Sequence, residues 1–208
     1  MIRPAWTAAG ALTLALGLGG CITLFPKEPP AQLYRFDVSL PAAPAAEGGP
    51  ISVRIAAVDF DAASSGDKIL TVDGDQVAYV GGGRWASPAS ELFTESVWHA
   101  FNTAGGRARL VGPGPGKAEY RLIIEVSRFE ARYLNGLAAA PTVVVHLHAT
   151  LERQSDLVVV AEKEFDDTAS ASDNRVGPIV TAYGQATTQA VGDMVAWVNT
   201  PAAADERT

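Results

Sequence analysis

The first half of the chain contains short runs in which apolar and polar residues alternate, the pattern of half-buried β-strands. This alternation predicts strands at residues 33–38, 51–58, 69–73 and 76–80. In the second of these, one face collects Ile51, Val53, Ile55 and Ala57. Gly74 and Asp75 separate the last two strands and predict a hairpin turn, and the run Gly81–Gly83 ends that hairpin.

Two segments instead repeat apolar residues every three or four positions, which predicts amphipathic helices. The first follows Ser87 and Pro88, a serine that can cap a helix and a proline suited to its first position, and continues to about Thr103. Its apolar stripe is Leu92, Phe93, Val97, Ala100 and Phe101. The second helix opens within residues 174–178 and continues to about Val198. Its stripe is Ile179, Tyr183, Ala186, Ala190, Met194 and Trp197.

Three longer strands are predicted between the helices. The first begins near Tyr120, and its alternation changes phase near Ser127 and Arg128, which indicates a β-bulge. The others span residues 143–152 and 157–165 and are joined by a loop at 154–156. This loop makes Leu151 face Val159 and Ala149 face Ala161, and leaves Lys163 opposite Leu147. Strands interleaved with helices predict an α/β fold, a mixed β-sheet packed with two main amphipathic helices.

An apolar run at the N-terminus, from about Ala8 to Leu18, follows the basic residue Arg3. It is shorter than the ~18 to 20 residues that cross a bilayer, which is typical of a signal peptide. Cys21, the only cysteine, comes directly after Gly19 and Gly20. This position indicates a lipobox, with cleavage between Gly20 and Cys21 and lipid attachment at Cys21. The alternative is an ordinary secretory signal followed by an unrelated cysteine.

The chain therefore divides into a signal peptide (1–20), a lipidated cysteine with a proline-rich tether (21–31), one domain (32–200) and a flexible tail (201–208). Residue 22 is isoleucine instead of the aspartate that retains lipoproteins in the inner membrane, which favours the periplasmic face of the outer membrane. Removing residues 1–20 takes away one basic residue and changes the formal net charge from −7 to −8. An acidic domain argues against nucleic acid or an anionic membrane surface as the main partner.

One set of residues has the chemistry of a metal site. The predicted register places His148 opposite Glu162 and His146 opposite Glu164 on one strand face, and zinc accepts such ligands. A flat strand face does not direct four side chains at one ion, so exposed cross-strand contacts are the favoured interpretation. We therefore predict no metal.

No motif in the sequence predicts catalysis. A Gly-x-Ser-x-Gly elbow is absent, and the run Gly81–Gly83 lacks the Gly-Lys-Ser/Thr that completes a phosphate-binding loop. Acylation would consume Cys21, and His99 has no nucleophile motif beside it. Nothing in the sequence brings the carboxylates at positions 59, 61, 166 and 167 together. We expect a protein that is not an enzyme and that uses no cofactor.

Arg84 and Trp85 are the candidate partner contacts, because arginine and tryptophan are enriched at the hot spots of protein interfaces. The alternative, which the sequence favours, is a hydrophobic staple in which Trp85 packs under the start of the first helix.

Several stretches, taken in order, resemble the ABC-type transport auxiliary lipoproteins, the family that includes PqiC-like proteins. They are the lipobox Cys21, Tyr34-Arg35-Phe36-Asp37, residues 51–58, Asp75–Tyr79, and Arg84-Trp85 followed by Ser87–Leu92. The resemblance covers about residues 32–198 and identifies 32–200 as the transport auxiliary domain. The chain departs from the family pattern at residues 60–69, which weakens any transfer of interface residues in that loop.

The resemblance implies a fold similar to the N-terminal domain of TolB. It also implies a non-catalytic periplasmic auxiliary component of an ABC transport system for lipids or other hydrophobic molecules. The implied partners are a permease, an ATPase and a mammalian-cell-entry-domain protein with which the lipoprotein docks, and a homo-oligomeric ring is conceivable. Two other functions stay open. An envelope scaffold or an activator of cell-wall synthases could share the anchor and the fold, and a lipid carrier would need a hydrophobic cavity.

Overall fold

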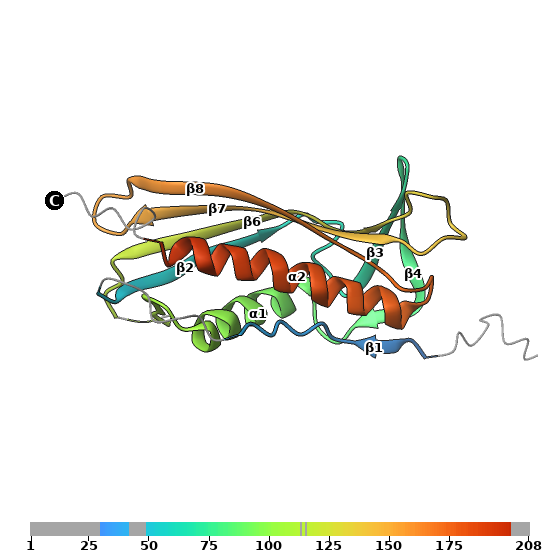
Figure 1. Ribbon diagram of the computed structural model, residues 1–208, viewed down its shortest axis with the longest axis horizontal. Helices are drawn as coiled ribbons and strands as arrows, with labels where there is room; N and C mark the ends of the chain where they lie inside the picture. Colours follow the sequence, from blue (N-terminus) through green and yellow to red (C-terminus); the bar gives the residue numbers. More distant parts are fainter. Residues whose placement is uncertain (1–29, 42–48, 113, 115, 201–208) are drawn as a thin grey trace, which may run out of the picture. The chain divides into compact units, whose positions relative to one another are not determined.

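Eight strands form one mixed sheet, and both helices pack against the same face of it (Figure 1). The computed structural model describes residues 30–41, 49–112, 114 and 116–200. The strands are β1 (Gln32–Tyr34), β2 (Ile51–Phe60), β3 (Lys68–Asp73), β4 (Gln76–Trp85), β5 (Ala108–Leu110), β6 (Tyr120–Arg132), β7 (Thr142–Arg153) and β8 (Val159–Ser170). The helices are α1 (Ala89–Ala104) and α2 (Val176–Val198). The predicted α/β fold with a mixed sheet and two main helices is confirmed.

Strand β6 organises the sheet. Along one edge it pairs with β7 over its whole length, and β8 pairs with β7 on the far side. Along the other edge, the first part of β6 pairs in parallel with β2, and its last two residues pair in parallel with β3. The sheet therefore divides beyond β6 into one branch ending at β5 and another that continues through β4 to β1.

The ring of Phe129, on β6, lies at the centre of the core. Its centroid is 4.8 to 6.5 Å from those of five other rings, which belong to Phe36, Phe60, Trp85, Phe93 and Tyr183. These rings come from the segment after β1, from β2, from β4 and from both helices. The Tyr183 hydroxyl donates a 2.8 Å hydrogen bond to the carbonyl of Leu70, so α2 is joined to β3 as well. One aromatic cluster thus holds the sheet branches and both helices together.

Two bulges set which side chains face the helices. The bulge predicted near Ser127 and Arg128 is present, and it keeps Phe129 directed inward beyond the break in register. A second bulge, between Ile55 and Ala57, was not predicted. Because one residue is added there, Ala57 pairs with Ile123 on the outer face instead of continuing the inward set, so this part of the prediction was wrong.

The register of β7 and β8 differs from the prediction by two residues. Leu151 pairs with Ala161 instead of Val159, and Leu147 pairs with Phe165 instead of Lys163. The turn accounts for one residue of this shift, because it is longer than predicted and is closed by a hydrogen bond from the Arg153 amide to the Val158 carbonyl. A bulge beside Leu151 accounts for the other residue. A shift of two residues preserves the faces of the strands, which is why the predicted inward set is still buried.

The run Gly81–Gly83 does not end a hairpin but lies inside β4. The pairing of β4 with β3 shifts register across these glycines, and this shift lets β4 turn from β3 toward β1, where Gly83 pairs with Gln32. Gly82 has a φ of 72°, and a Cβ at Gly83 would lie 2.7 Å from Val176 of α2. The glycines therefore permit both the bend and the close approach of the helix.

Helix α1 starts one residue later than predicted. Pro88 is the cap residue, and Ser87 makes no capping hydrogen bond. The first amides of the helix instead donate to the loop before β3: Ala89 to the carbonyl of Gly66 and Ser90 to that of Ser65, at 2.9 and 3.2 Å. Carbonyl groups of the loop before β3 thus accept hydrogen bonds from the first amides of α1, which the sequence predicts the Ser87 side chain to cap.

The predicted strand at residues 33–38 is shorter in the structure, and β5 was not predicted. After β1 the chain leaves the sheet and runs against both helices, with Phe36 and Val38 buried. Gly192 of α2 makes room for the Leu40 side chain, since an added Cβ would lie 3.0 Å from it. The Arg35 guanidinium meets the Glu95 carboxylate of α1 at 3.2 Å.

Candidate docking surface

The outer faces of β6, β7 and β8 carry polar side chains, because both helices cover the opposite face of the sheet (Figure 1). We call this surface the open sheet face. Its charged and histidine side chains are Arg121, Glu125, Arg128, Glu130, Arg132, His146, His148, Glu152, Glu162, Glu164 and Asp166. With neutral histidines, this set has six carboxylates against three guanidinium groups, so its net charge is negative.

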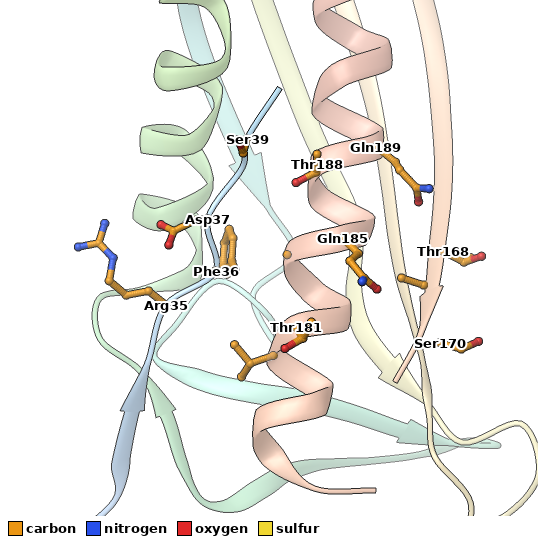
Figure 2. Close-up of a pocket in the computed structure, with 13 residues that line it drawn as sticks. Arg35, Phe36, Asp37, Ser39, Thr168, Ser170, Thr181, Gln185, Thr188 and Gln189 are labelled. Carbon is orange, nitrogen blue, oxygen red and sulfur yellow. The ribbon is translucent and has the colours of Figure 1, made fainter. Parts of the chain in front are cut away.

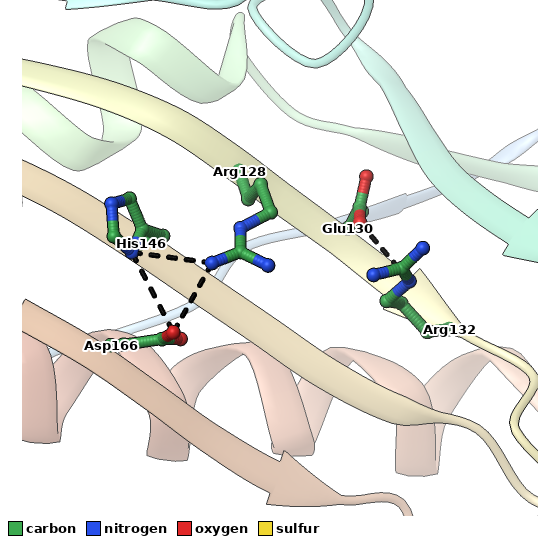
Figure 3. Close-up of polar contacts among 5 residues, drawn as sticks. All are labelled: Arg128, Glu130, Arg132, His146 and Asp166. Atoms are coloured by element: carbon green, nitrogen blue, oxygen red, sulfur yellow. Dashed lines mark hydrogen bonds and ion pairs between the residues drawn. The ribbon is translucent and has the colours of Figure 1, made fainter.

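A cluster of three side chains lies at the middle of the open sheet face (Figure 3). An Nη2 atom of Arg128 lies 3.1 Å from Asp166 Oδ2 and 3.4 Å from His146 Nδ1. The same His146 nitrogen is 3.7 Å from Asp166 Oδ2. The β6 bulge creates this cluster, since it turns Arg128 outward beside His146 while Val126 and Phe129 both stay in the core.

The other two arginines of the face are also paired with carboxylates. Arg121 lies 3.3 Å from Glu152. Arg132 lies 3.4 Å from Glu130, and Figure 3 draws this second pair. Both pairs are partly exposed at the protein surface, where an ion pair adds little to stability, about 0 to 1 kcal/mol, but fixes where the charges stand. Once each arginine is matched with a carboxylate, the excess negative charge of the set falls on Glu125, Glu162 and Glu164. This face is suited to a partner that presents basic side chains.

The two histidines do not pair with the glutamates that the sequence predicted. Because of the register shift, His148 pairs with Glu164 and His146 with Asp166. The His148 Nε2 atom is 3.9 Å from Glu162, far beyond the ~2.0 to 2.2 Å of zinc coordination. Among the described residues, no group of three or more His, Cys, Asp or Glu side chains is placed to hold a metal ion.

The neighbouring carboxylates Asp166 and Asp167 point to opposite faces of β8. Asp166 belongs to the open sheet face, whereas Asp167 faces α2. Burial raises the pKa of Asp167, and the nearby charges of Asp193 and Asp166 raise it further. Adjacent strand residues cannot act together on one substrate atom, so these two do not form an acid–base pair.

The two candidate partner contacts lie in different environments. The ring of Trp85 is 2% exposed and packs edge-on against Phe36 and Tyr183, at centroid distances of 5.2 and 5.1 Å. Its contacts are those of a core residue, so almost none of this ring is accessible to a partner. The Arg84 guanidinium is exposed and pairs with Asp67 at 2.9 Å, and it remains the member of the pair that a partner could reach.

The lipid attachment residue Cys21 and the cleavage residue Gly20 lie outside the described residues, as do the tail residues 201–208. In the part of the chain that the structure describes, no helix has the length and apolar character needed to span a membrane.

A groove of about 760 Å³ follows the exposed side of α2 (Figure 2). It is lined by the segment Arg35–Ser39, by the end of β8 and by the hydroxyl and amide side chains of Thr181, Gln185, Thr188 and Gln189. His99 lies in a smaller groove of about 380 Å³ between that segment and α1, together with Asp37 and Glu95. Both grooves open to the surface, and hydroxyl, amide or charged side chains line part of each, so neither is the enclosed apolar chamber that a lipid carrier would need.

The sequence predicts part of the open sheet face. The alternation in β7 already directs His146, His148 and Glu152 away from the core. The side chains that β8 contributes could not be placed correctly, because the turn length and the bulge set the register.

Comparisons with known proteins agree with this fold. The crystal structure of protein XCC0632 from Xanthomonas campestris is similar, with 26% sequence identity and a TM-score of 0.73 over 80% of this chain and 94% of that one. The hypothetical protein CT253 from Chlamydia trachomatis has the same fold at 11% identity, with a TM-score of 0.54 over 76% of this chain and 100% of that one. No curated protein matches the sequence.

The model of the ABC-type transport auxiliary lipoprotein component matches residues 34–195, from β1 to the last turn of α2. This match includes the aromatic core, the open sheet face and both helices. Membership of a lipoprotein family indicates a lipid-anchored protein of the cell envelope that associates with a transport system. The chain belongs to the family of ABC-type transport auxiliary lipoprotein components.

Proposed function

We propose that this lipoprotein is anchored through Cys21 at the periplasmic face of the outer membrane and acts there without catalysis. In this proposal it docks with the mammalian-cell-entry-domain protein of an ABC transport system that moves lipids or other hydrophobic molecules. The observation that carries the proposal is the family match over residues 34–195. Hydrolysis of ATP would belong to the ATPase subunit, and this chain would contribute the stability of the docked assembly.

The polar groups of the domain support a docking role more than a chemical one. The Arg128, His146 and Asp166 side chains bond to one another on an exposed face. His99 lies on α1, whereas Asp61 lies in the loop after β2, where its carboxylate accepts a hydrogen bond from the Ala63 amide and stabilises a turn. A nucleophile with an adjacent base is the usual requirement for covalent catalysis, and these contacts supply no such pair.

We propose the open sheet face as the docking surface for the mammalian-cell-entry-domain protein. Its long strands give a rigid platform, and its negative net charge favours a partner with basic residues. The lipid anchor would hold this platform close to the membrane, so docking occurs at a raised local concentration. Removing the anchor should therefore weaken the assembly even though no contact residue is changed.

The test is an unbiased crosslinking capture of the tagged lipoprotein from intact envelopes, with Cys21→Ala as the matched control. We expect the native chain to capture a permease, an ATPase and a mammalian-cell-entry-domain protein, and to separate with outer-membrane vesicles. The mass of the captured complex also reports whether several copies of the chain assemble. We expect Cys21→Ala to be folded, released from the membrane and poor in these partners.

Two results would contradict the proposal. Capture of cell-wall synthases without transport subunits would favour the envelope-scaffold function. A Cys21→Ala chain that stays fully membrane-bound and keeps its partners would show that acylation of Cys21 is not the anchor.

A further inference from the structure

Five large apolar side chains are exposed at one end of the described domain, and we call them the apolar rim: Leu33, Val77, Tyr79, Leu134 and Leu137. Between 43% and 70% of each is exposed. Their elements lie at the same end in Figure 1: β1, the β3–β4 hairpin and the loop from β6 to β7. Gln32, Tyr79 and Leu137 also line one groove, so the three elements meet there. Several exposed apolar side chains at one end mark a contact surface more strongly than isolated ones do.

The same end receives the N-terminal tether. β1 begins at Gln32, which is eleven positions after Cys21 in the sequence. Eleven residues of extended, proline-rich chain reach at most about 35 to 40 Å. An acylated Cys21 therefore keeps the apolar rim near the bilayer. Another exposed apolar group, Leu157 to Val159, lies at the turn between β7 and β8, at the opposite end of the sheet (Figure 1).

We infer that the apolar rim rests on the surface of the membrane that holds Cys21, and so orients the domain. This inference rests on the anchoring in the proposed function. The surroundings of Tyr79 suit the zone of lipid headgroups. Its hydroxyl donates to the Ala63 carbonyl at 3.2 Å, and the Lys68 ammonium lies 5.0 Å from its ring centroid. Aromatic rings that combine an apolar body with a polar tip are enriched at this depth, and long basic side chains are often found beside them.

The charges around the rim limit how deep it can go. Arg84 is paired with Asp67 at 2.9 Å, and Arg175 with Asp173 at 2.5 Å, so these two basic groups carry no local excess charge. Asp73 ends β3 directly before the turn of the β3–β4 hairpin, and Asp75 lies in that turn. Carboxylates are poorly tolerated in the hydrocarbon core, so the rim contacts the headgroup region without crossing it.

The experiment uses the full lipidated chain in vesicles of phosphatidylethanolamine and phosphatidylglycerol. Because Cys21 is the only cysteine and is acylated, Leu134→Cys or Leu137→Cys supplies a single thiol for an environment-sensitive fluorophore. Leu157→Cys is the matched control, since it is an exposed leucine at the opposite end. Mass spectrometry and flotation establish first that each variant is acylated and bound to vesicles.

We expect doxyl-labelled lipids to quench the fluorophore at residues 134 and 137 about threefold more than at 157, as expected for side chains at the bilayer surface. Equal or absent quenching in chains that float would overturn the inference and leave the anchor intact. Protection from aqueous iodide without quenching by lipid would also overturn it, because a protein or a second copy would then cover the rim. A chain that carries no acyl group and does not float would refute the anchor, and the inference with it.

Discussion

At the scale of single residues, Phe129 makes the contacts on which the core depends, because five other rings surround it. We expect Phe129→Ala to lower the free energy of unfolding by about 3 to 5 kcal/mol, since it removes a buried ring and leaves a cavity between the sheet and both helices. Urea denaturation measures this loss. Phe129→Leu is the control and should lose less, as it refills much of the space. A loss under about 1 kcal/mol for the alanine variant would contradict the central position of this ring.

Asp167 should make stability depend on pH. Its pKa is raised, first by burial and then by Asp193 and Asp166, so the folded protein binds this proton more tightly than the unfolded chain does. The charged form therefore lowers stability above the ordinary aspartate pKa of about 3.9, and protonation below it removes the effect. We expect Asp167→Asn to raise the melting temperature at pH 7 and to have no such effect at pH 3.

The control for this prediction is Asp59→Asn, at an exposed aspartate on β2. Thermal melts of both variants across pH 3 to 8 provide the comparison. A melting temperature of Asp167→Asn that falls at pH 7, or a gain that grows as the pH is lowered, would show that the Asp167 carboxylate is favourable in the folded state.

Sequence patterns placed the buried residues well and their partners less well. The inward positions of β7 and most of the stripe of α2 were predictable, because helix and strand periodicity depends only on neighbouring residues. The rings that contact Trp85 were not predictable, since Phe36 and Tyr183 lie on segments far from it in the sequence. The caps of α1 were missed for the same reason, as Ser65 and Gly66 supply them from another loop.

At the scale of elements, the turn between β7 and β8 contains Leu157 with a φ of 58°, a left-handed conformation that is unfavourable for a leucine. Its amide donates to the Arg153 carbonyl at 2.9 Å, and this turn accounts for part of the register shift. We expect Leu157→Gly to raise the free energy of unfolding by about 0.5 to 1 kcal/mol, because glycine adopts this conformation without strain.

Leu157→Ala is the matched control for the turn, because it removes the same exposed side chain and keeps a Cβ in the left-handed conformation. Chemical denaturation of the two variants separates strain from exposure of the side chain. If the glycine variant were no more stable than the alanine variant, the turn would not be strained by its backbone conformation.

Element boundaries were predicted best where the pattern was long. The helix at 176–198 and the bulge in β6 followed from periodicity and its interruption. The three residues of β5 carry too little pattern to be recognised, and they form a strand because β2 pairs with them. The glycine run Gly81–Gly83 predicts the end of a hairpin instead of the interior of β4, since sequence alone does not show that α2 packs closely against it.

At the scale of the whole molecule, the fold class and the family were predictable, but the arrangement of side chains on the open sheet face was not. Alternating strands and two amphipathic helices allow few architectures. The branching of the sheet at β6 depends on two parallel pairings that are distant in sequence. The open sheet face also needs the register of β8, so its cluster of Arg128, His146 and Asp166 appears only in the structure.

The central claim is that the domain docks with transport subunits through the open sheet face. The most direct measurement is photocrosslinking in intact envelopes, with a photoreactive amino acid placed at Glu164 on this face or, as the control, at Gln189 on the exposed side of α2. We expect position 164 to crosslink to the mammalian-cell-entry-domain protein and position 189 not to do so. Crosslinks to that protein from position 189 alone, or to cell-wall synthases from position 164, would contradict the account.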